Sequence, residues 1–192
     1  MSRRRASKRQ LISLVISLIV AVSGYYAAKH PNQAAQITAN IPAGTYRVTE
    51  FVDGDTIAVD MNGRSEKIRM IGVDTPETHD PRKSVECFGQ AAAAYTKELI
   101  GDKPVRLEAD QLSTNRDRYD RLLRYVYTAD NKLVEAELIK NGYGFAYVSF
   151  PFIKLEEFRG YESAARDQKK GLWSGCQPYT DKDGHIHSNA AP

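Results

Sequence analysis

The sequence predicts an α+β domain in which five short strands close into a barrel accompanied by three helices. Apolar residues alternate over five short stretches, a helix pattern follows the third stretch, and two more helix patterns follow the fifth. Hydrophobic residues make up 42% of the chain and charged residues 27%, which is typical of a globular protein. The 192 residues therefore suit one domain with an extension at each end.

The first three strands are predicted to form an antiparallel meander at residues 46–52, 56–60 and 66–73. Asn62-Gly63 is a strong signal for a tight turn between the second and third strands. Because the chain folds back there, we expect residues 53–56 to lie beside residues 69–72.

The remaining elements are two strands, at 105–110 and 121–128, and three helices, at 88–100, 133–143 and 153–170. Five short strands with a helix between the third and fourth fit a small closed barrel of the OB type. The curved face of such barrels commonly binds nucleic acids or sugars, although a fold alone does not decide function.

The N-terminus has the composition of an export segment. Residues 1–10 carry five basic residues and no acid, and residues 11–28 carry no charge. A cleaved signal peptide and a retained membrane anchor over residues 1–28 both fit this pattern, and both place the rest of the chain outside the cytoplasm. Residues 29–44 are polar and aperiodic, and they indicate a linker before a domain over 45–176.

The net charge limits how the domain could bind a polyanion, and the two cysteines indicate a disulfide. The formal net charge is +3, and residues 1–10 contribute +5 of it, so the remainder carries −2. An acidic domain cannot hold a polyanion through bulk charge, and any such site must be local. Cys87 and Cys176 are the only cysteines, and an even pair in an exported chain favours a disulfide. Two unrelated buried thiols are the alternative.

Polar residues gather where the third predicted strand ends, at Asp74-Thr75-Pro76-Glu77. A helix capping box would explain this pattern, but no helix period follows it. The predicted hairpin instead brings Asp55 close to Asp74. Two such carboxylates suit a hard cation, Ca²⁺ or Mg²⁺, because they otherwise repel each other.

Arginines are predicted to surround the same end of the barrel, with Arg69 on the third strand and RDRYDRLLR at residues 116–124. A dication, a further carboxylate such as Glu77 and two guanidinium groups are the parts needed for phosphoryl transfer. Surface salt bridges would explain each charge taken alone, but the combination favours a reactive site.

Four segments together resemble the thermonuclease family, the staphylococcal-nuclease-like domains. They are VDGDT (52–56), IRMIGVDTPET (68–78), DRYDRLLRYVY (117–127) and GLW (171–173), within a likeness over about residues 46–176. The resemblance implies an OB barrel with three helices. It also implies Ca²⁺-dependent endonuclease cleavage of DNA and RNA with little sequence specificity, leaving 3′-phosphates.

The resemblance also implies roles for individual residues. One Ca²⁺ would be held by Asp55, Asp74 and the carbonyl of Thr75, with Asp53 behind them; Glu77 would be the general base; Arg69 and Arg121 would clamp the phosphate; Arg118, Tyr119, Tyr147, Arg82 and Lys83 would contact substrate. Two positions depart from the best-known member, with Asp120 in place of a glycine and Ser149 in place of a tyrosine.

The leading interpretation is an exported, monomeric nuclease that prefers single-stranded or unpaired DNA and RNA. A non-catalytic nucleic-acid-binding module and a phosphodiesterase of small substrates are the alternatives, and Glu77 argues against the first, because binding alone needs no base. Residues 177–192 contain DKDG followed by His185 and His187. They match only half of an EF-hand loop, and a flexible tail is favoured over a second metal site.

Overall fold

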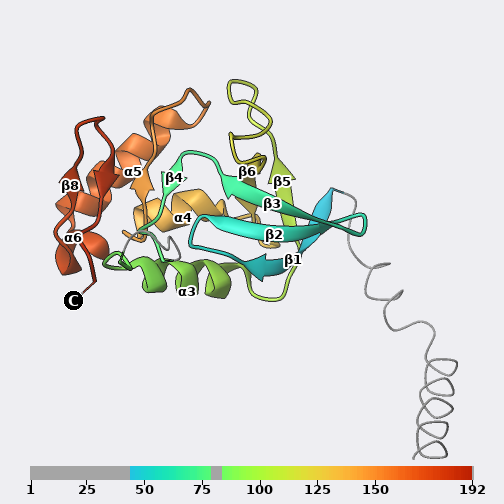
Figure 1. The fold of residues 1–192 in the computed structure, drawn as a ribbon, viewed down its shortest axis with the longest axis horizontal. Coiled ribbons are helices and arrows are strands. Elements are labelled where there is room, and N and C mark those ends of the chain that lie inside the picture. The colour runs from blue at the N-terminus through green and yellow to red at the C-terminus, as the bar shows by residue number, and fades with distance from the viewer. Residues whose placement is uncertain (1–43, 79–83, 192) are drawn as a thin grey trace, which may run out of the picture. The chain divides into compact units, whose positions relative to one another are not determined.

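The computed structural model describes residues 44–78 and 84–191, so the predicted leader and almost all of the predicted linker lie outside it. Five strands close a barrel in the order β1-β2-β3-β6-β5 (Figure 1). Their bounds are Thr45–Phe51, Thr56–Met61, Arg64–Met70, Leu122–Tyr127 and Val105–Glu108 in that order. Only β3 and β6 pair in parallel. The predicted α+β class and five-stranded barrel are confirmed.

The hairpin of β2 and β3 sets the geometry of one barrel end. Asn62 and Gly63 have φ angles of 56° and 82°, the left-handed values that a tight hairpin turn needs. Thr56 then pairs with Arg69, as the sequence predicts for residues 53–56 and 69–72. The segment that precedes β2 therefore reaches the segment that follows β3.

The third strand ends earlier than predicted. It stops at Met70, and Gly72 turns the chain with φ 75°. A Cβ atom at Gly72 would lie 2.6 Å from the Phe152 ring, so only glycine fits this turn without displacement. The chain then continues as β4 (Val73–Asp74), which pairs with β7 (Phe145–Ala146) in a separate two-stranded sheet. Asp74 is thus held outside the barrel.

Three longer helices occur among the described residues, as predicted, and their ends differ by a few residues from the sequence pattern. They are α3 (Gly89–Ile100), α4 (Val134–Lys140) and α5 (Leu155–Asp167), followed by the short α6 (Leu172–Gly175). Figure 1 shows α3 alongside β1, and α4 between the barrel and α5. Fully buried apolar side chains from barrel and helices form one core, including Ile57, Ile68, Val126, Leu138 and Phe158. None of the helices in the described ranges is long and apolar enough to cross a membrane.

The C-terminal residues form an ordered hairpin where the sequence suggests a flexible tail. Strands β8 (Tyr179–Thr180) and β9 (Ile186–His187) pair in antiparallel fashion. The disulfide Cys87–Cys176 ties the segment to the start of α3, which confirms the predicted bridge. The Cys87 amide also donates to the Asn189 carbonyl at 2.7 Å. This anchoring could not be read from composition, because it depends on pairing with residues about 90 positions earlier.

Candidate active site

The turn before β2 and the loop after β4 meet in direct contact. The Thr75 amide and hydroxyl both donate to Oδ2 of Asp55, at 2.9 and 3.1 Å. The approach is so close that a Cβ atom at Gly54 would lie 2.7 Å from the Thr75 hydroxyl oxygen. The buried Thr96 hydroxyl of α3 donates to the Gly54 carbonyl at 2.6 Å and holds the turn from the other side. Asp55 is therefore fixed in place and only 6% exposed.

Arg69 joins Asp55 to Asp74. Its guanidinium nitrogens lie 3.2 Å from Oδ2 of Asp55 and 2.7 Å from Oδ1 of Asp74. It also donates to the Val73 carbonyl at 2.7 Å, which fixes the direction in which the side chain points. Three of the predicted site residues are thus gathered at one point of the barrel rim.

The acidic groups at this rim lie close enough to change one another's protonation. Burial, the neighbouring Asp55 charge and Glu77 raise the pKa of Asp53 to about 7. Loss of solvation, with a contribution from Asp55 that opposes the Arg69 charge, raises the pKa of Asp74 to about 6. Crowded carboxylates of this kind provide the oxygen ligands that Ca²⁺ or Mg²⁺ prefers, and a cation would relieve their repulsion. The residues present fit a hard dication.

Glu77 belongs to the same acidic group through Asp53. Its carboxylate lies near enough to Asp53 to raise the pKa of that residue. The Thr78 amide donates to Oε1 of Glu77 at 2.9 Å, and the Thr78 hydroxyl donates to Oδ1 of Asp53 at 3.0 Å. The structure thus places Glu77 beside Asp53, the residue predicted to lie behind the ligands.

Arg121 approaches the site from the other side, through Thr56. Its Nη1 lies 3.5 Å from the Thr56 hydroxyl, which donates to Oδ1 of Asp55 at 2.9 Å. Asp117 holds the arginine in this position, because its Oδ2 accepts from Nε and pairs with Nη2, each at 2.7 Å. Asp117 and Thr56 were not among the predicted site residues. The four-residue spacing of Asp117 and Arg121 and the final residue of the DGDT motif were the available signals.

The departure at Asp120 is accommodated by the loop. Its φ of 63° lies in the left-handed region that glycine favours. Glycine is also the residue that the family resemblance leads us to expect at this position. Its side chain is 88% exposed and pairs with Arg116 at 3.6 Å. The added negative charge therefore has a partner of its own, apart from Arg121.

Three of the predicted substrate residues, Arg118, Tyr119 and Tyr147, lie around this centre. Tyr119 is 63% exposed and lies beneath both flanking guanidinium groups, 4.8 Å from Cζ of Arg118 and 5.3 Å from Cζ of Arg121. Tyr147 lines a surface pocket together with Asp74, Ser149 and His185. Its amide donates to the Gly72 carbonyl at 2.9 Å, which places it near the start of β4 and Asp74. Arg82 and Lys83 lie outside the described residues.

The structure defines a class of small α+β proteins, those in which a closed five-stranded barrel gathers carboxylates and arginines at one rim. Carboxylates of this kind suit a hard cation, and guanidinium groups suit a phosphate. Residues 67–175 match the family model described as "Staphylococcal nuclease homologue". The chain belongs to this family.

The chain is also similar to curated proteins over most of its length. It is 36% identical to the thermonuclease of Staphylococcus hyicus, over 85% of this chain and 95% of the relative. It is 34% identical to endonuclease YncB of Bacillus subtilis (strain 168), over 85% and 90% respectively. It is 35% identical to the thermonuclease of Staphylococcus intermedius, over 69% of this chain and 76% of the relative. All three of these relatives are named as nucleases.

Proposed function

We propose that this protein is a Ca²⁺-dependent endonuclease that hydrolyses phosphodiester bonds of DNA and RNA with little sequence specificity and leaves 3′-phosphates. The observation that carries the proposal is the convergence of Asp55 and Asp74 on Arg69, beside Asp53 and Glu77. The relatives' names support the nuclease class. The OB-type assignment of the barrel and the cleavage position follow from the family likeness.

One Ca²⁺ ion would be held by the carboxylates of Asp55 and Asp74 and the carbonyl of Thr75. When bound, the ion supplies charge neutralisation for a phosphate oxygen and lowers the pKa of a coordinated water. Asp55 is preorganised for this role, because Thr75 and Thr56 each donate a hydrogen bond to it. Arg69 pairs with both carboxylates and would therefore present its guanidinium group beside a phosphate bound there.

The remaining charged groups have complementary roles. Glu77 would accept the proton of the attacking water as a general base. Arg69 and Arg121 would donate to the phosphate oxygens as negative charge grows on them, since a guanidinium group binds such oxygens in bidentate fashion. Asp117 keeps Arg121 directed at the site through the contacts described above.

Substrate would be held by Arg118, Tyr119 and Tyr147, with Arg82 and Lys83 contributing further cationic contacts. Exposed rings such as Tyr119 suit unpaired bases or terminal phosphates better than a closed duplex. We therefore propose a preference for single-stranded or unpaired regions, by a protein that acts as a monomer.

The domain over 45–176 would act outside the cytoplasm. The disulfide between Cys87 and Cys176 supports an oxidising compartment. Residues 1–28 would be a signal peptide or membrane anchor, and residues 11–28 would contact the membrane if retained. N-terminal sequencing of the exported protein would distinguish the two.

The activity is tested by comparing cleavage of denatured DNA, RNA and a small phosphodiester, each with Ca²⁺ and with a chelator. We expect cleavage of both polymers that the chelator abolishes. Binding of denatured DNA without cleavage would instead indicate a binding module, and cleavage of the small ester alone would indicate a different phosphodiesterase.

A further inference from the structure

The hairpin of β8 and β9 brings together three side chains of metal-binding type, Asp181, His185 and His187. One ligand atom from each lies within 4.8 Å of the other two. His185 directly precedes β9 and His187 ends it, and the centroids of their two rings lie 6.5 Å apart. Asp181 lies across the turn from them.

Both oxygens of the Asp181 carboxylate are held in position by neighbouring groups. Its Oδ1 accepts hydrogen bonds from the amides of Asp183 and His185, each at 2.9 Å. Its Oδ2 points to Nε2 of His187, also at 2.9 Å. A cation between Oδ2 of Asp181 and Nε2 of His187 would take the place of the proton that these two atoms share.

The hairpin that carries these groups is held firmly at its base. The Gln177 amide donates to the Asn189 side chain at 2.7 Å, and the Ala191 amide donates to the Val85 carbonyl at 2.8 Å. Cys176 is covalently bound to Cys87. Little chain entropy therefore remains to oppose ordering of the ligands, and Asp181 and His187 are 28% and 23% exposed, which leaves a path for an ion from solvent.

We propose that Asp181, His185 and His187 bind a divalent transition-metal cation, and that Zn²⁺ is the ion that this ligand set suits best. Two imidazoles and one carboxylate are typical zinc ligands, with bonds of about 2.0–2.2 Å, and three protein ligands leave a coordination position for water. Ligand atoms at a tetrahedral zinc lie about 3.3 Å apart by those bond lengths, so small side-chain rotations close the site. This site is distinct in ligand chemistry from the all-oxygen group at Asp55 and Asp74.

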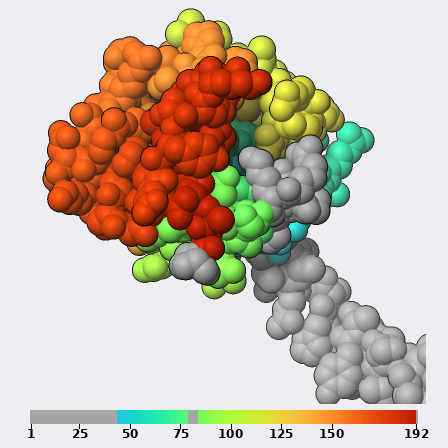
Figure 2. Space-filling view, turned by 60° about the vertical axis from the view of Figure 1, so that its left-hand side comes forward, coloured from blue at the N-terminus to red at the C-terminus, as the bar shows by residue number. Residues whose placement is uncertain are grey.

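A metal ion bound at the hairpin would lie at the edge of the pocket that Tyr147 lines. His185 lines the pocket that contains Asp74 and Tyr147, and its ring centroid lies 5.4 Å from that of Tyr147. Figure 2 shows the C-terminal segment, in red, running across this face of the molecule beside the orange segment that contains α5. A bound ion would fix one wall of the pocket and add positive charge there.

The test is a zinc titration of the full chain, freed of metal and then kept in excess Ca²⁺ so that hard oxygen sites are filled. A chromophoric zinc chelator competes for the ion, and cobalt absorption provides a second readout of bound metal. We expect one zinc per chain. His185→Ala and His187→Ala should each lower affinity by at least about 10–100-fold, the loss that follows even from removing groups that support a ligand.

Two control variants match these changes. Asp183→Asn removes an exposed carboxylate of the same turn, and His30→Ala removes an imidazole far away in the sequence. Both should bind zinc as the unaltered chain does. The proposal is overturned if the unaltered chain does not compete with the chelator, or if it binds zinc no better than the two histidine variants. Near-ultraviolet circular dichroism verifies that each variant is folded, and His187→Gln replaces His187→Ala if the latter is not. Nuclease activity enters none of these measurements, so the outcome is independent of the proposed function.

Discussion

Thr56 pairs directly with Arg69 across the β2–β3 ladder. This pairing places Asp55, which directly precedes β2, beside the end of β3. The Arg69 guanidinium nitrogens therefore lie 3.2 Å from Asp55 and 2.7 Å from Asp74. The acidic group and its arginine are thus a product of hairpin register. Shifting the register by one residue would turn Arg69 toward the opposite face of the sheet.

Replacing Glu77 by Gln should slow turnover by about 10²–10⁴-fold, because an amide cannot accept the proton of the attacking water. Binding of denatured DNA should change little. Single-turnover cleavage rates and equilibrium binding measure the two effects separately, with Glu50→Gln, an exposed change on β1, as control. An equal loss of binding and rate would argue against Glu77 as a base.

Replacing Arg69 by Lys should lower kcat by about 10²–10³-fold, comparable to removal of one preorganised donor to a transition state. Lysine keeps the charge but cannot donate to Asp55, Asp74 and the Val73 carbonyl together. The matched control is Arg106→Lys, since Arg106 forms an exposed pair with Glu108 on β5. Steady-state kinetics that place both variants at the same rate would contradict the role of Arg69.

Loss of the Cys87–Cys176 disulfide should lower the free energy of unfolding by about 4.6 kcal/mol, the chain-entropy value for a loop closed by a separation of 89 residues. Urea unfolding with and without a reductant measures this difference. The double variant Cys87→Ser and Cys176→Ser should be insensitive to the reductant. A reductant effect of the same size in that variant would show that the loss has another cause.

Glu135 should make the protein less stable as pH rises. Its side chain is fully buried and accepts from the Val126 amide at 3.0 Å, and burial raises its pKa well above the ordinary value of 4.5. Above pH 4.5 the unfolded chain releases this proton while the folded chain keeps it, so the group contributes a slope of about −1.4 kcal/mol per pH unit.

Urea unfolding across a pH series tests this, since Glu135→Gln removes the titration and keeps an accepting oxygen for Val126. The difference in stability between the two proteins should shift in favour of the variant as pH rises from 4.5. Parallel pH profiles for the two proteins would show that Glu135 is ionised in the folded chain.

Much of the site followed from the sequence because it depends on local signals. Asn62-Gly63 specifies a tight turn, and that turn brings Asp55 toward Asp74 at the end of the hairpin. The break at Gly72 was not predictable, because it reflects the packing of Phe152 from a distant segment. The C-terminal hairpin was not predicted for the same reason, because the contacts that hold it come from the distant residues Val85 and Cys87.

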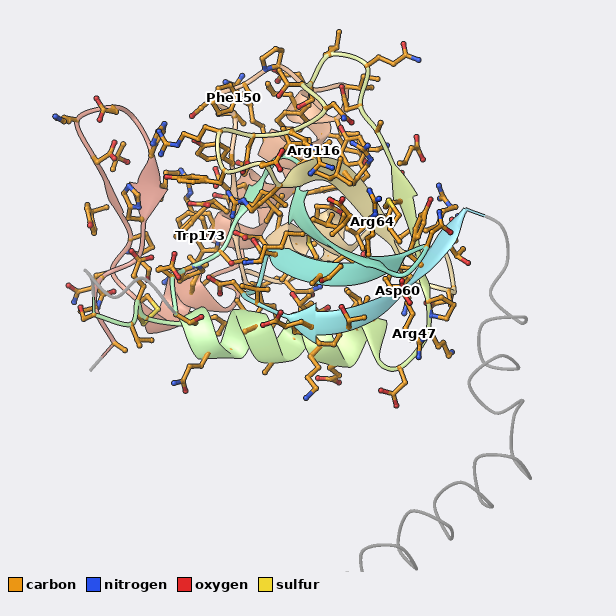
Figure 3. The ribbon with its side chains drawn as sticks, turned by 45° about the vertical axis from the view of Figure 1, so that its right-hand side comes forward. Arg47, Asp60, Arg64, Arg116, Phe150 and Trp173 are labelled. Atoms are coloured by element: carbon orange, nitrogen blue, oxygen red, sulfur yellow. A yellow bond between two sulfur atoms is a disulfide. The ribbon has the colours of Figure 1, made fainter. Side chains whose placement is uncertain are left out.

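Metal binding by Asp55 is tested most directly by the rate of denatured-DNA cleavage as a function of Ca²⁺ concentration. Asp55→Asn should require at least about tenfold more Ca²⁺ for half-maximal rate, because one charged ligand is lost. Asp60→Asn is the control, since Asp60 lies near the far end of β2 and pairs with Arg47 at 3.8 Å (Figure 3). Asp60→Asn should cleave as the unaltered chain does. Cleavage that persists in excess chelator, or the same Ca²⁺ dependence for Asp55→Asn and the unaltered chain, would contradict the account.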